Sequence, residues 1–309
     1  MNKKVLIFKS NDNGFERFCS SKFESEGYDV ADPYRIPFSS MTKLQKRLFF
    51  GRFRWFSRLY MGDWKKTIRD YDTVIIFDSA LTKQLVRFVR SANRKCDIRI
   101  WLWNTDPIDK EFYGGYCGIY TFDRLFAEKH GYNYIPQFYF DGVSCSRADV
   151  TPGVFFAGYD KGRYDELKKI ASLFDEHHIT HRLIMKKEEG VSYLADDKVV
   201  LIEKDIDYPD LLHQMTSYSC LLELNINGQS GLTLRALEAL FNSRKLITNN
   251  KDITKYDFYN PGNIFLLGID DESRLEDFVS SPFEPVDADV ISGYSFRNWI
   301  GKITGEQHG

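Results

Sequence analysis

The sequence predicts an α/β fold built from two Rossmann-like, doubly wound domains that face a cleft. The chain has 309 residues, and at about 100–200 residues per domain this length favours two domains. Short β-rich runs alternate with helical patterns, which is typical of βαβ units around a parallel sheet. The alternation stops at residues 141–153 and then starts again, so each half is expected to form its own sheet.

The first half holds the elements expected of one such domain. The run 73–77 is short and almost wholly apolar, as expected of a strand that is covered on both faces. Gly27 and Gly131 follow two helical patterns at positions where helices commonly end. The expected strands are 4–9, 28–31, 73–77, 98–103 and 118–122, and the expected helices are 14–26, 81–91 and 123–130.

Gly, Ser, Asp and Pro gather in the segment 141–153, which we interpret as the linker between the domains. The first domain is therefore expected over 1–145 and the second over 151–287. The expected strands of the second domain are 154–156, 181–185, 199–202, 220–225, 245–248 and 264–267, and its helices are 162–174, 210–217 and 232–242. Over 288–309 we expect an amphipathic helix anchored by Trp299, which either packs back on the first domain or belongs to the core of the second.

Cysteine usage and hydropathy point to a cytoplasmic protein. The five cysteines are odd in number, widely spaced and without a CxxC pair, which favours free thiols in a reducing compartment. No stretch approaches the roughly 18 consecutive apolar residues of a membrane span, and the first apolar run is too short for a signal peptide.

Positive charge is concentrated in one segment, residues 43–69. The segment holds nine basic side chains against the single acid Asp63, a net charge of +8, although the whole chain carries −2. It is also rich in aromatic side chains. Basic and aromatic residues together favour contact with anionic lipid headgroups or a lipid-linked pyrophosphate, and we name Arg52, Arg54, Trp55 and Arg58 as candidates. The alternative is an amphipathic helix whose aromatic face packs on its own domain. No nucleic-acid-binding signature accompanies the segment.

The most informative stretch of the second half is 225–240. A buried strand is expected to end at Asn225, a loop with Gly228 and Gly231 follows, and a strong helical pattern begins near residue 232. Glycines let the backbone approach a ligand, and a helix start offers free N–H groups, which together suit a diphosphate. Ser230 and Thr233 can cap the helix or donate to phosphate oxygens. A plain strand–turn–helix connection would use the same residue types.

The run 229–238 (QSGLTLRALE), with 245–250 (KLITNN) and 257–263 (DFYNPGN), resembles a family of bacterial GT-B-fold glycosyltransferases. These enzymes assemble lipopolysaccharide, O-antigen and capsule, and the similarity spans about residues 154–267. The resemblance implies a nucleotide-sugar donor bound by the second domain. It places Glu238 on the ribose, and it places the following residues at the diphosphate and sugar: Gln229, Ser230, Gly231, Thr233 and, within the same motif, Arg235.

One position departs from the pattern of many retaining members of this fold. These enzymes carry a second glutamate in Glu-x7-Glu spacing, and Ser230 occupies that position here. The sequence therefore leaves open whether the reaction inverts or retains configuration.

A second segment, 155–163 (FFAGYDKGR), is similar to the first strand and turn of GT-B donor domains. It would bring Gly158 to the ligand and place Lys161 and Arg163 against the diphosphate. This fold commonly needs no metal, so protein cations and a helix dipole must neutralise the leaving group. The alternative is a surface turn with solvated basic side chains.

Acidic residues that follow expected strands of the first domain are the candidates for the catalytic base. We rank Asp12 first and Asp106 second, and we add Asp78; Trp103 would stack on an acceptor sugar. Each acid is also a plausible helix-cap or turn residue. The DxD string at Asp205 and Asp207 is interpreted as capping loop acids, and neither it nor the histidines at 177–181 predicts a metal site.

These inferences predict a metal-independent glycosyltransferase that needs no cofactor. It would transfer a sugar from a nucleotide-diphosphate donor to a lipid-linked or cell-surface glycan in bacterial polysaccharide or lipopolysaccharide synthesis. The expected location is the inner face of the cytoplasmic membrane, where the protein would be peripheral and contact anionic lipid. Two alternatives remain: a non-catalytic, membrane-recruiting subunit of a glycosyltransferase complex, and a nucleotide-sugar epimerase on the same fold.

Overall fold

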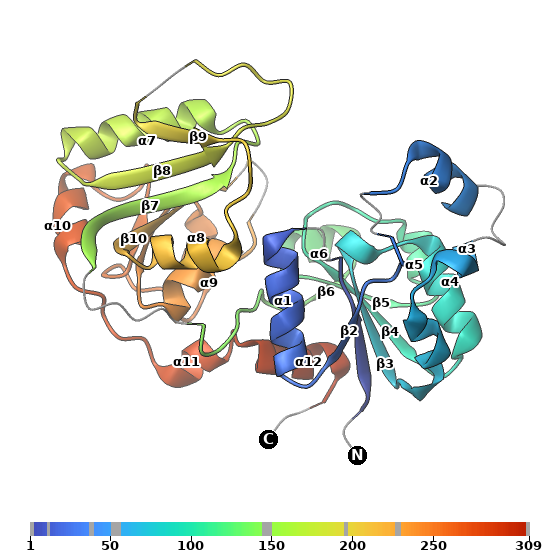
Figure 1. Ribbon diagram of the computed structural model, residues 1–309. Helices are drawn as coiled ribbons and strands as arrows, with labels where there is room; N and C mark the ends of the chain where they lie inside the picture. The colour runs from blue at the N-terminus through green and yellow to red at the C-terminus, as the bar shows by residue number, and fades with distance from the viewer. Residues whose placement is uncertain are drawn as a thin grey trace. The chain divides into compact units, whose positions relative to one another are not determined.

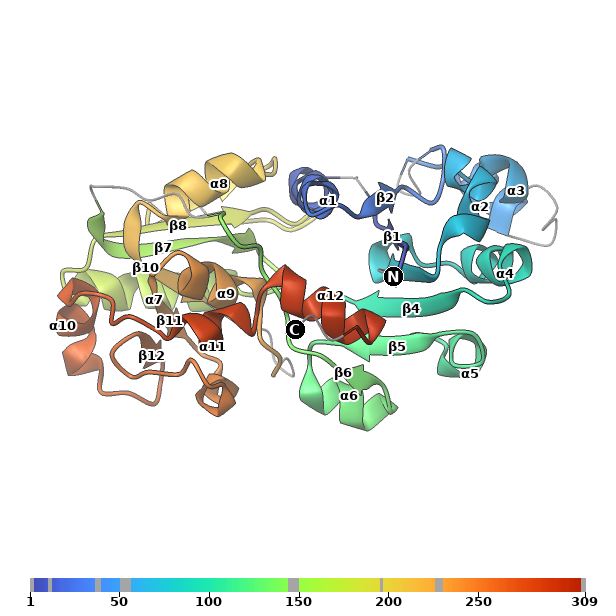
Figure 2. The same cartoon turned by 90° about the horizontal axis from the view of Figure 1, so that it is seen from below.

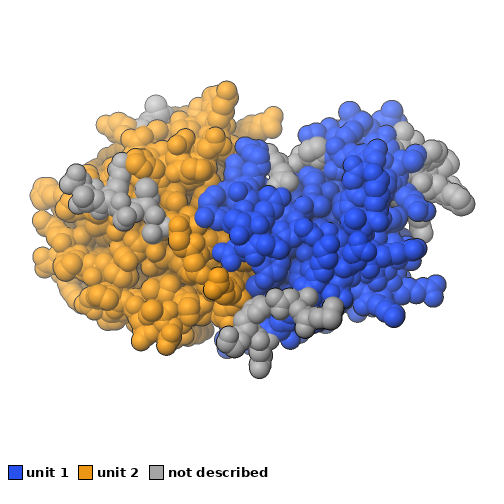
Figure 3. Space-filling view, turned by 60° about the horizontal axis from the view of Figure 1, so that its bottom comes forward, with its two compact units in different colours: residues 1–135, 300–309 blue, residues 136–299 orange. Residues whose placement is uncertain are grey.

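The computed structural model describes residues 3–10, 13–36, 40–50, 57–143, 150–194, 197–225 and 230–306. They form two compact units, residues 1–135 with 300–309 and residues 136–299 (Figure 3). Each unit contains a six-stranded, wholly parallel sheet with helices (Figure 1). The predicted fold class of two Rossmann-like α/β domains is confirmed.

The first unit has the strand order β2-β1-β3-β4-β5-β6. Strand order reverses between β1 and β3, which makes that position the topological switch point of this sheet. The strands are β1 (Val5–Phe8), β2 (Asp29–Ala31), β3 (Thr73–Phe77), β4 (Asp97–Leu102), β5 (Gly118–Thr121) and β6 (Asn133–Tyr134). The helices are α1 (Gly14–Ser25), α2 (Lys43–Phe50), α3 (Ser57–Tyr60), α4 (Lys83–Ala92), α5 (Lys110–Tyr113) and α6 (Arg124–His130), with 3-10 helices η2 (Asp63–Lys66), η3 (Ile68–Asp70) and η4 (Asp78–Ala80).

Helix limits in this unit follow from local chemistry. The Asn13 side chain accepts a hydrogen bond from the Glu16 amide (2.9 Å) and so caps the start of α1. Beyond the end of α1 the chain turns at Gly27, whose φ of +87° favours glycine. Every residue of β3 is buried, as predicted for a central parallel strand.

The second unit has the order β9-β8-β7-β10-β11-β12, which is the Rossmann strand order with a switch point between β7 and β10. The strands are β7 (Thr151–Tyr159), β8 (His181–Lys186), β9 (Val199–Ile202), β10 (Tyr218–Glu223), β11 (Lys245–Thr248) and β12 (Ile264–Leu266). The helices are α7 (Tyr164–Glu176), α8 (Tyr208–Met215), α9 (Leu234–Phe241), α10 (Leu275–Ser280) and α11 (Ala288–Ser292), with 3-10 helices η5 (Lys251–Lys255) and η6 (Glu272–Arg274). Helix α12 (Phe296–Thr304) begins in this unit and ends in the first.

Helices cover both faces of this second sheet. Helices α7 and α8 lie on opposite faces (Figure 2), and alternate strand residues supply the core on each side. On the α7 face, Val154 and Leu183 pack with Phe174 of α7 and Leu275 of α10. The central strands, such as β10 and β11, are therefore largely buried on both faces, and ligands are expected at the loops that follow the strands.

The C-terminal segment forms two helices, α11 and α12, where one was predicted. Gly293 ends α11, and Trp299 of α12 is 2% exposed, with its ring centroid 4.3 Å from that of Phe138. Residues 300–309 group with the first unit, and the boundary at 135/136 precedes the predicted linker 141–153. In the part of the chain that the structure describes, no helix is both long and apolar enough to cross a membrane.

Candidate functional site

The switch point of the second sheet is occupied by the guanidinium of Arg163. Its Nη2 donates to the carbonyl of Tyr159 at the end of β7 (2.5 Å), and its Nη1 donates to the carbonyl of Leu224, which follows β10. Burial lowers the pKa of Arg163, the charges of Asp160 and Glu166 raise it, and the charge of Arg235 lowers it; an arginine stays protonated in proteins nonetheless. A cation is therefore held at the position where ligands of such sheets bind.

The turn before α7 is shaped around this arginine. A Cβ at Gly158 would lie 3.3 Å from Nη2 of Arg163 and 3.1 Å from the Phe156 ring, so a side chain there would crowd the guanidinium. Buried Asp160 accepts hydrogen bonds from the amides of Arg163 (3.0 Å) and Tyr164 (2.9 Å), and so caps α7. Lys161 is exposed in the turn with a φ of +47°.

The start of α9 is tied to the ends of β10 and β11 through a buried carboxylate. Thr233 is the N-cap of α9, and its hydroxyl donates to Oε1 of Glu223 at the end of β10. The hydroxyl of Thr248, at the end of β11, donates to Oε2 of the same residue. Glu223 is 3% exposed, and burial raises its pKa, against the two hydroxyl hydrogen bonds that lower it.

The raised pKa of Glu223 gives a testable pH dependence. The folded state holds the proton to higher pH than the unfolded chain, so ionisation costs stability as pH rises from about 4, the usual carboxyl pKa. Glu223→Gln cannot ionise, and its free energy of unfolding should rise relative to wild type between acidic and neutral pH. Urea unfolding over that range tests this, with the exposed Glu176→Gln as the control. A stability difference that does not change with pH would contradict it.

Glu238 lies in a buried network inside the second unit. It is 2% exposed; its Oε1 accepts a hydrogen bond from the Tyr208 hydroxyl (2.7 Å) and its Oε2 pairs with Nη1 of Arg235 (3.0 Å). The hydroxyls of Tyr139 and Tyr208 are also hydrogen-bonded to each other (2.7 Å). Arg235 donates further to the carbonyl of Ala157 in β7 (2.9 Å). Both oxygens of Glu238 are thus engaged within the protein, and its contact with a ribose stays a prediction.

Two other predicted donor residues, Ser230 and Gly231, lie just before α9, and a third is not among the described residues. Ser230 is half-buried, and the carbonyl of buried Gly231 accepts from Nδ2 of Asn250 at 3.5 Å. Gln229 lies outside the described residues. The structure therefore brings Gly158 and Arg163 together with Arg235, and it ties Thr233 to the neighbouring end of β10.

The switch point of the first sheet also holds a buried cation, Lys9. It directly follows β1, is 1% exposed and forms an ion pair with Glu16. Its Nζ lies 4.7 Å from the ring centroid of Phe77, at the end of β3, and 4.9 Å from that of Trp103. Trp103 is half-buried and also packs against Phe15, with ring centroids 5.7 Å apart. Lys9 was not predicted as a site residue, because a lysine at a strand end is usually solvated.

Asp78, which directly follows β3, is hydrogen-bonded to the loop that follows β4. Its Oδ2 accepts from the amide of Trp103 (3.0 Å) and from both the amide (3.0 Å) and Nδ2 (3.1 Å) of Asn104. Its Oδ1 accepts from the amide of Ser79 (2.9 Å). Burial raises the pKa of Asp78, whereas the Asn104 hydrogen bonds and the charge of Lys9 lower it. Asp78 therefore connects the loops after β3 and β4, which is a structural role.

The remaining residues predicted for catalysis, acceptor binding or membrane contact are either exposed or outside the described residues. Asp106 is exposed in the loop after β4, and Arg58 is exposed in α3. Asp12, Arg52, Arg54 and Trp55 lie outside the described residues.

Oδ1 of Asp205, in the DxD string, forms an ion pair with Nζ of Lys186 (2.8 Å) and accepts a hydrogen bond from the Tyr159 hydroxyl (2.8 Å). Asp207 directly precedes α8, at its N-cap position. Among the described residues, no group of three His, Cys, Asp or Glu side chains is placed to hold a metal ion.

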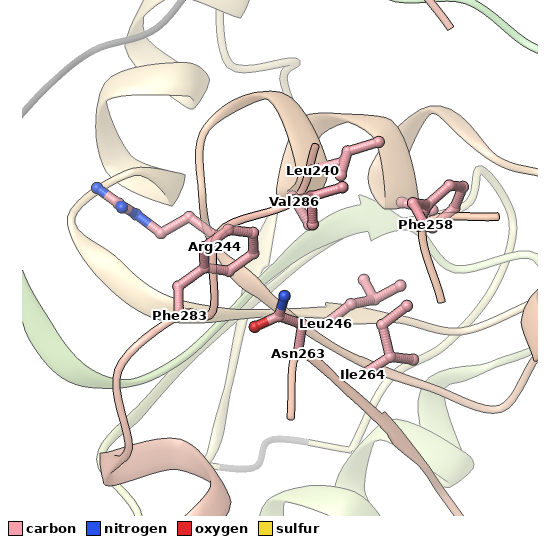
Figure 4. A pocket seen from close by; sticks show the side chains of 10 residues that line it. Leu240, Arg244, Leu246, Phe258, Asn263, Ile264, Phe283 and Val286 are labelled. Atoms are coloured by element: carbon pink, nitrogen blue, oxygen red, sulfur yellow. The ribbon is translucent and has the colours of Figure 1, made fainter. Parts of the chain in front are cut away.

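A small apolar pocket lies elsewhere in the second unit, beside α9, β11 and β12 (Figure 4). Its volume is about 20 Å³, which is room for about one water molecule. The guanidinium of Arg244 points away from it, to the carbonyl of Thr216 (2.8 Å). The pocket is lined by Ala236, Ala239, Leu240, Arg244, Leu246, Phe258, Asn263, Ile264, Phe283 and Val286. It is too small for a sugar or a nucleotide.

Comparison with solved structures shows that the chain has the fold of GT-B glycosyltransferases. It is similar to AviGT4, a glycosyltransferase involved in avilamycin A biosynthesis, with TM-score 0.60, 11% identity and coverage of 99% of this chain and 97% of the other. It is also similar to a UDP-forming α,α-trehalose-phosphate synthase from Burkholderia xenovorans, with TM-score 0.55, 9% identity and coverage of 99% and 97%.

A third similar structure is a DNA-modifying β-glucosyltransferase studied with and without uridine diphosphoglucose. The TM-score is 0.51 at 12% identity, with coverage of 97% of this chain and 99% of the other. No family model and no curated protein sequence matches the chain. At these identities the similarity establishes the fold.

Proposed function

We propose that the protein is a glycosyltransferase that uses a nucleotide-diphosphate sugar as donor. The observation that carries this proposal is Arg163, which bridges the ends of β7 and β10 at the switch point of a Rossmann sheet. Departure of a nucleoside diphosphate leaves negative charge on the phosphates, and a preorganised cation at that position stabilises it. The similar β-glucosyltransferase has uridine diphosphoglucose as its substrate, and the similar synthase is UDP-forming.

In the proposed reaction the protein itself neutralises the leaving group, without a metal ion. Arg163 supplies a fixed charge, the exposed Lys161 supplies a second one, and the first amides of α9 beyond Thr233 supply hydrogen-bond donors. The 229–238 motif would place Ser230, Gly231 and Gln229 around the diphosphate and the sugar.

We assign acceptor binding to the switch point of the first sheet. Trp103 would support one face of an acceptor sugar, and Nζ of the buried Lys9, 4.9 Å from its ring centroid, holds the ring in place. Asp78 accepts four hydrogen bonds, one from Ser79 in its own loop and three from Trp103 and Asn104 in the loop after β4, which leaves Asp12 and exposed Asp106 as the candidate bases.

Substitution of these two acids distinguishes the candidates. Loss of a general base costs about 10²–10⁴-fold in turnover, so either Asp12→Asn or Asp106→Asn should lower kcat by that factor with little change in donor affinity. Steady-state transfer assays measure both values, and Asp78→Asn is the comparison. Full activity in both Asp12 and Asp106 variants would remove them from the mechanism.

For the acceptor we propose a lipid-linked or cell-surface glycan of bacterial polysaccharide or lipopolysaccharide synthesis, met at the inner face of the cytoplasmic membrane. The support is the 43–69 segment, with its net charge of +8 and its aromatic side chains. A soluble substrate would gain nothing from such a surface.

A thermal-shift screen followed by calorimetry tests the donor proposal. Nucleoside diphosphates and nucleotide sugars should raise the Tm, because a ligand that binds only the folded state stabilises it. Absence of binding by every nucleotide would contradict the proposal. Donor binding without transfer to any acceptor would instead indicate a non-catalytic subunit, and conversion of the donor sugar without an acceptor would indicate an epimerase.

A further inference from the structure

A groove of about 740 Å³ lies in the first unit between the 3-10 helices η2 and η3 and one face of α4. Helix α4 contributes Gln84, Arg87, Phe88 and Ser91, whose spacing of three and four residues places them on the same helix face. The remaining lining residues are Arg58, Met61, Lys65, Lys66, Ile68, Arg69 and Ala92.

The lining of the groove is cationic. Five of its side chains are basic and none is acidic. Two of them donate to backbone carbonyls: Lys65 to that of Arg58 (3.2 Å) and Arg69 to that of Ala92 (3.3 Å). Lys66 pairs with Asp63 at 3.1 Å.

The two remaining arginines, Arg58 and Arg87, lie over aromatic rings. Their guanidinium carbons are 5.7 Å from the ring centroid of Phe88 and 4.7 Å from that of Phe112, respectively. Within the described ranges, neither has a carboxylate within ion-pair distance. Their positive charges are therefore available to an anion in the groove.

Apolar side chains at the groove indicate what kind of anion it suits. Phe88 is half-buried in the lining, and Leu59, the neighbour of Arg58 in α3, is 62% exposed. In α2, which belongs to the same basic segment, Leu44 is 66% exposed. Exposed leucines beside basic residues are typical of surfaces that enter the headgroup region of a bilayer, whereas a site for a soluble anion has no use for them.

We propose that this groove binds the phosphate of an anionic membrane lipid, with Arg58 and Arg87 on the phosphate and Leu59 at the acyl boundary. The proposal rests on the membrane association proposed above and assigns it to a defined site. All the residues involved belong to the first unit, and none of them belongs to the donor site.

Vesicle binding by the full-length protein tests the site. The probe is vesicles of equal parts phosphatidylcholine and phosphatidylglycerol, with pure phosphatidylcholine vesicles as the uncharged comparison. Each basic residue at an anionic surface contributes about fivefold to binding, so Arg58→Gln/Arg87→Gln should weaken association roughly 25-fold. Arg94→Gln/Lys95→Gln removes two exposed charges outside the groove and should change it less than about twofold. If both double variants lose vesicle association equally, binding depends on overall charge and the proposal of a defined site is wrong.

Two further measurements identify the source of the phosphate. Leu59→Gln should weaken vesicle association by at least about threefold, because part of the free energy of burying a leucine side chain in the bilayer is lost. The same substitution should leave the binding of inorganic pyrophosphate unchanged. If pyrophosphate or a short DNA duplex binds the groove as tightly as the vesicles do, and Leu59→Gln has no effect, the groove is a soluble-anion or nucleic-acid site and the proposal is wrong. Donor binding measured on the same variants should be unaltered, so a failure of the glycosyltransferase proposal is seen separately.

Discussion

Glu238→Ala should lower the free energy of unfolding by about 3–5 kcal/mol, the range for removing one partner of a buried ion pair. Arg235 would keep its charge inside the protein without the carboxylate 3.0 Å away, and the Tyr208 hydroxyl would lose its acceptor. Urea unfolding measures the change. Glu272→Ala, at an exposed position of η6, is the control and should stay within about 0.5 kcal/mol of wild type. An equally small loss at Glu238 would contradict the buried network.

The same residue tests the predicted contact with the ribose of the donor. Glu238→Gln keeps an oxygen that accepts from Tyr208, so it should destabilise less than alanine and remain folded at room temperature. If Glu238 also accepts ribose hydroxyls, calorimetry should show severely weakened binding of the nucleoside diphosphate in both folded variants. Unchanged affinity for every nucleotide tested would restrict Glu238 to the structural role that its burial indicates.

Arg163→Met should reduce transfer by at least about 10²-fold, the usual effect of removing one preorganised group that stabilises the transition state. The loss should appear in kcat/KM and in the Kd of the nucleoside diphosphate, because the charge at the switch point disappears. Stability should fall by about 1–3 kcal/mol, since the carbonyls of Leu224 and Tyr159 lose a charged donor. Transfer assays, calorimetry and urea unfolding separate these effects.

Two companion variants make the Arg163 experiment specific. Arg163→Lys keeps the charge but cannot reach both carbonyls at once, so it should recover part of the nucleotide affinity and little of the stability. Lys161→Met removes an exposed charge from the same turn and should have the smaller effect. Full nucleotide affinity in Arg163→Met would contradict the proposed donor site.

Most of the fold could be predicted from the sequence because its central strands are apolar and bounded by turn residues. The run 73–77 coincides with β3, and 199–202 and 245–248 coincide with β9 and β11. Strand β6 was not predicted, because its two residues are too few to show a pattern. The predicted C-terminal helix divides at Gly293, a break that its amphipathic pattern does not reveal.

The candidate site was predictable only where a local motif marks it. The glycine-containing turn at 158–163 pointed to Arg163, and the 229–238 string pointed to Thr233. Glu223 and Lys9 were missed because each is a charged residue at the end of an apolar run, where exposure is the ordinary expectation. Their burial depends on partners elsewhere in the chain: Thr233 and Thr248 for Glu223, and the Trp103 ring for Lys9.

The first unit is discontinuous in sequence, and this affects when it can form. Its second portion, residues 300–309, follows the whole second unit in the sequence, yet Ile300 and Ile303 are almost wholly buried and Nζ of Lys3 donates to the carbonyl of Thr304 (3.0 Å). Although domains usually fold in order from the ribosome, the first unit has all six of its strands by residue 134 but gains its contacts with residues 300–306 only after the second unit has been synthesised.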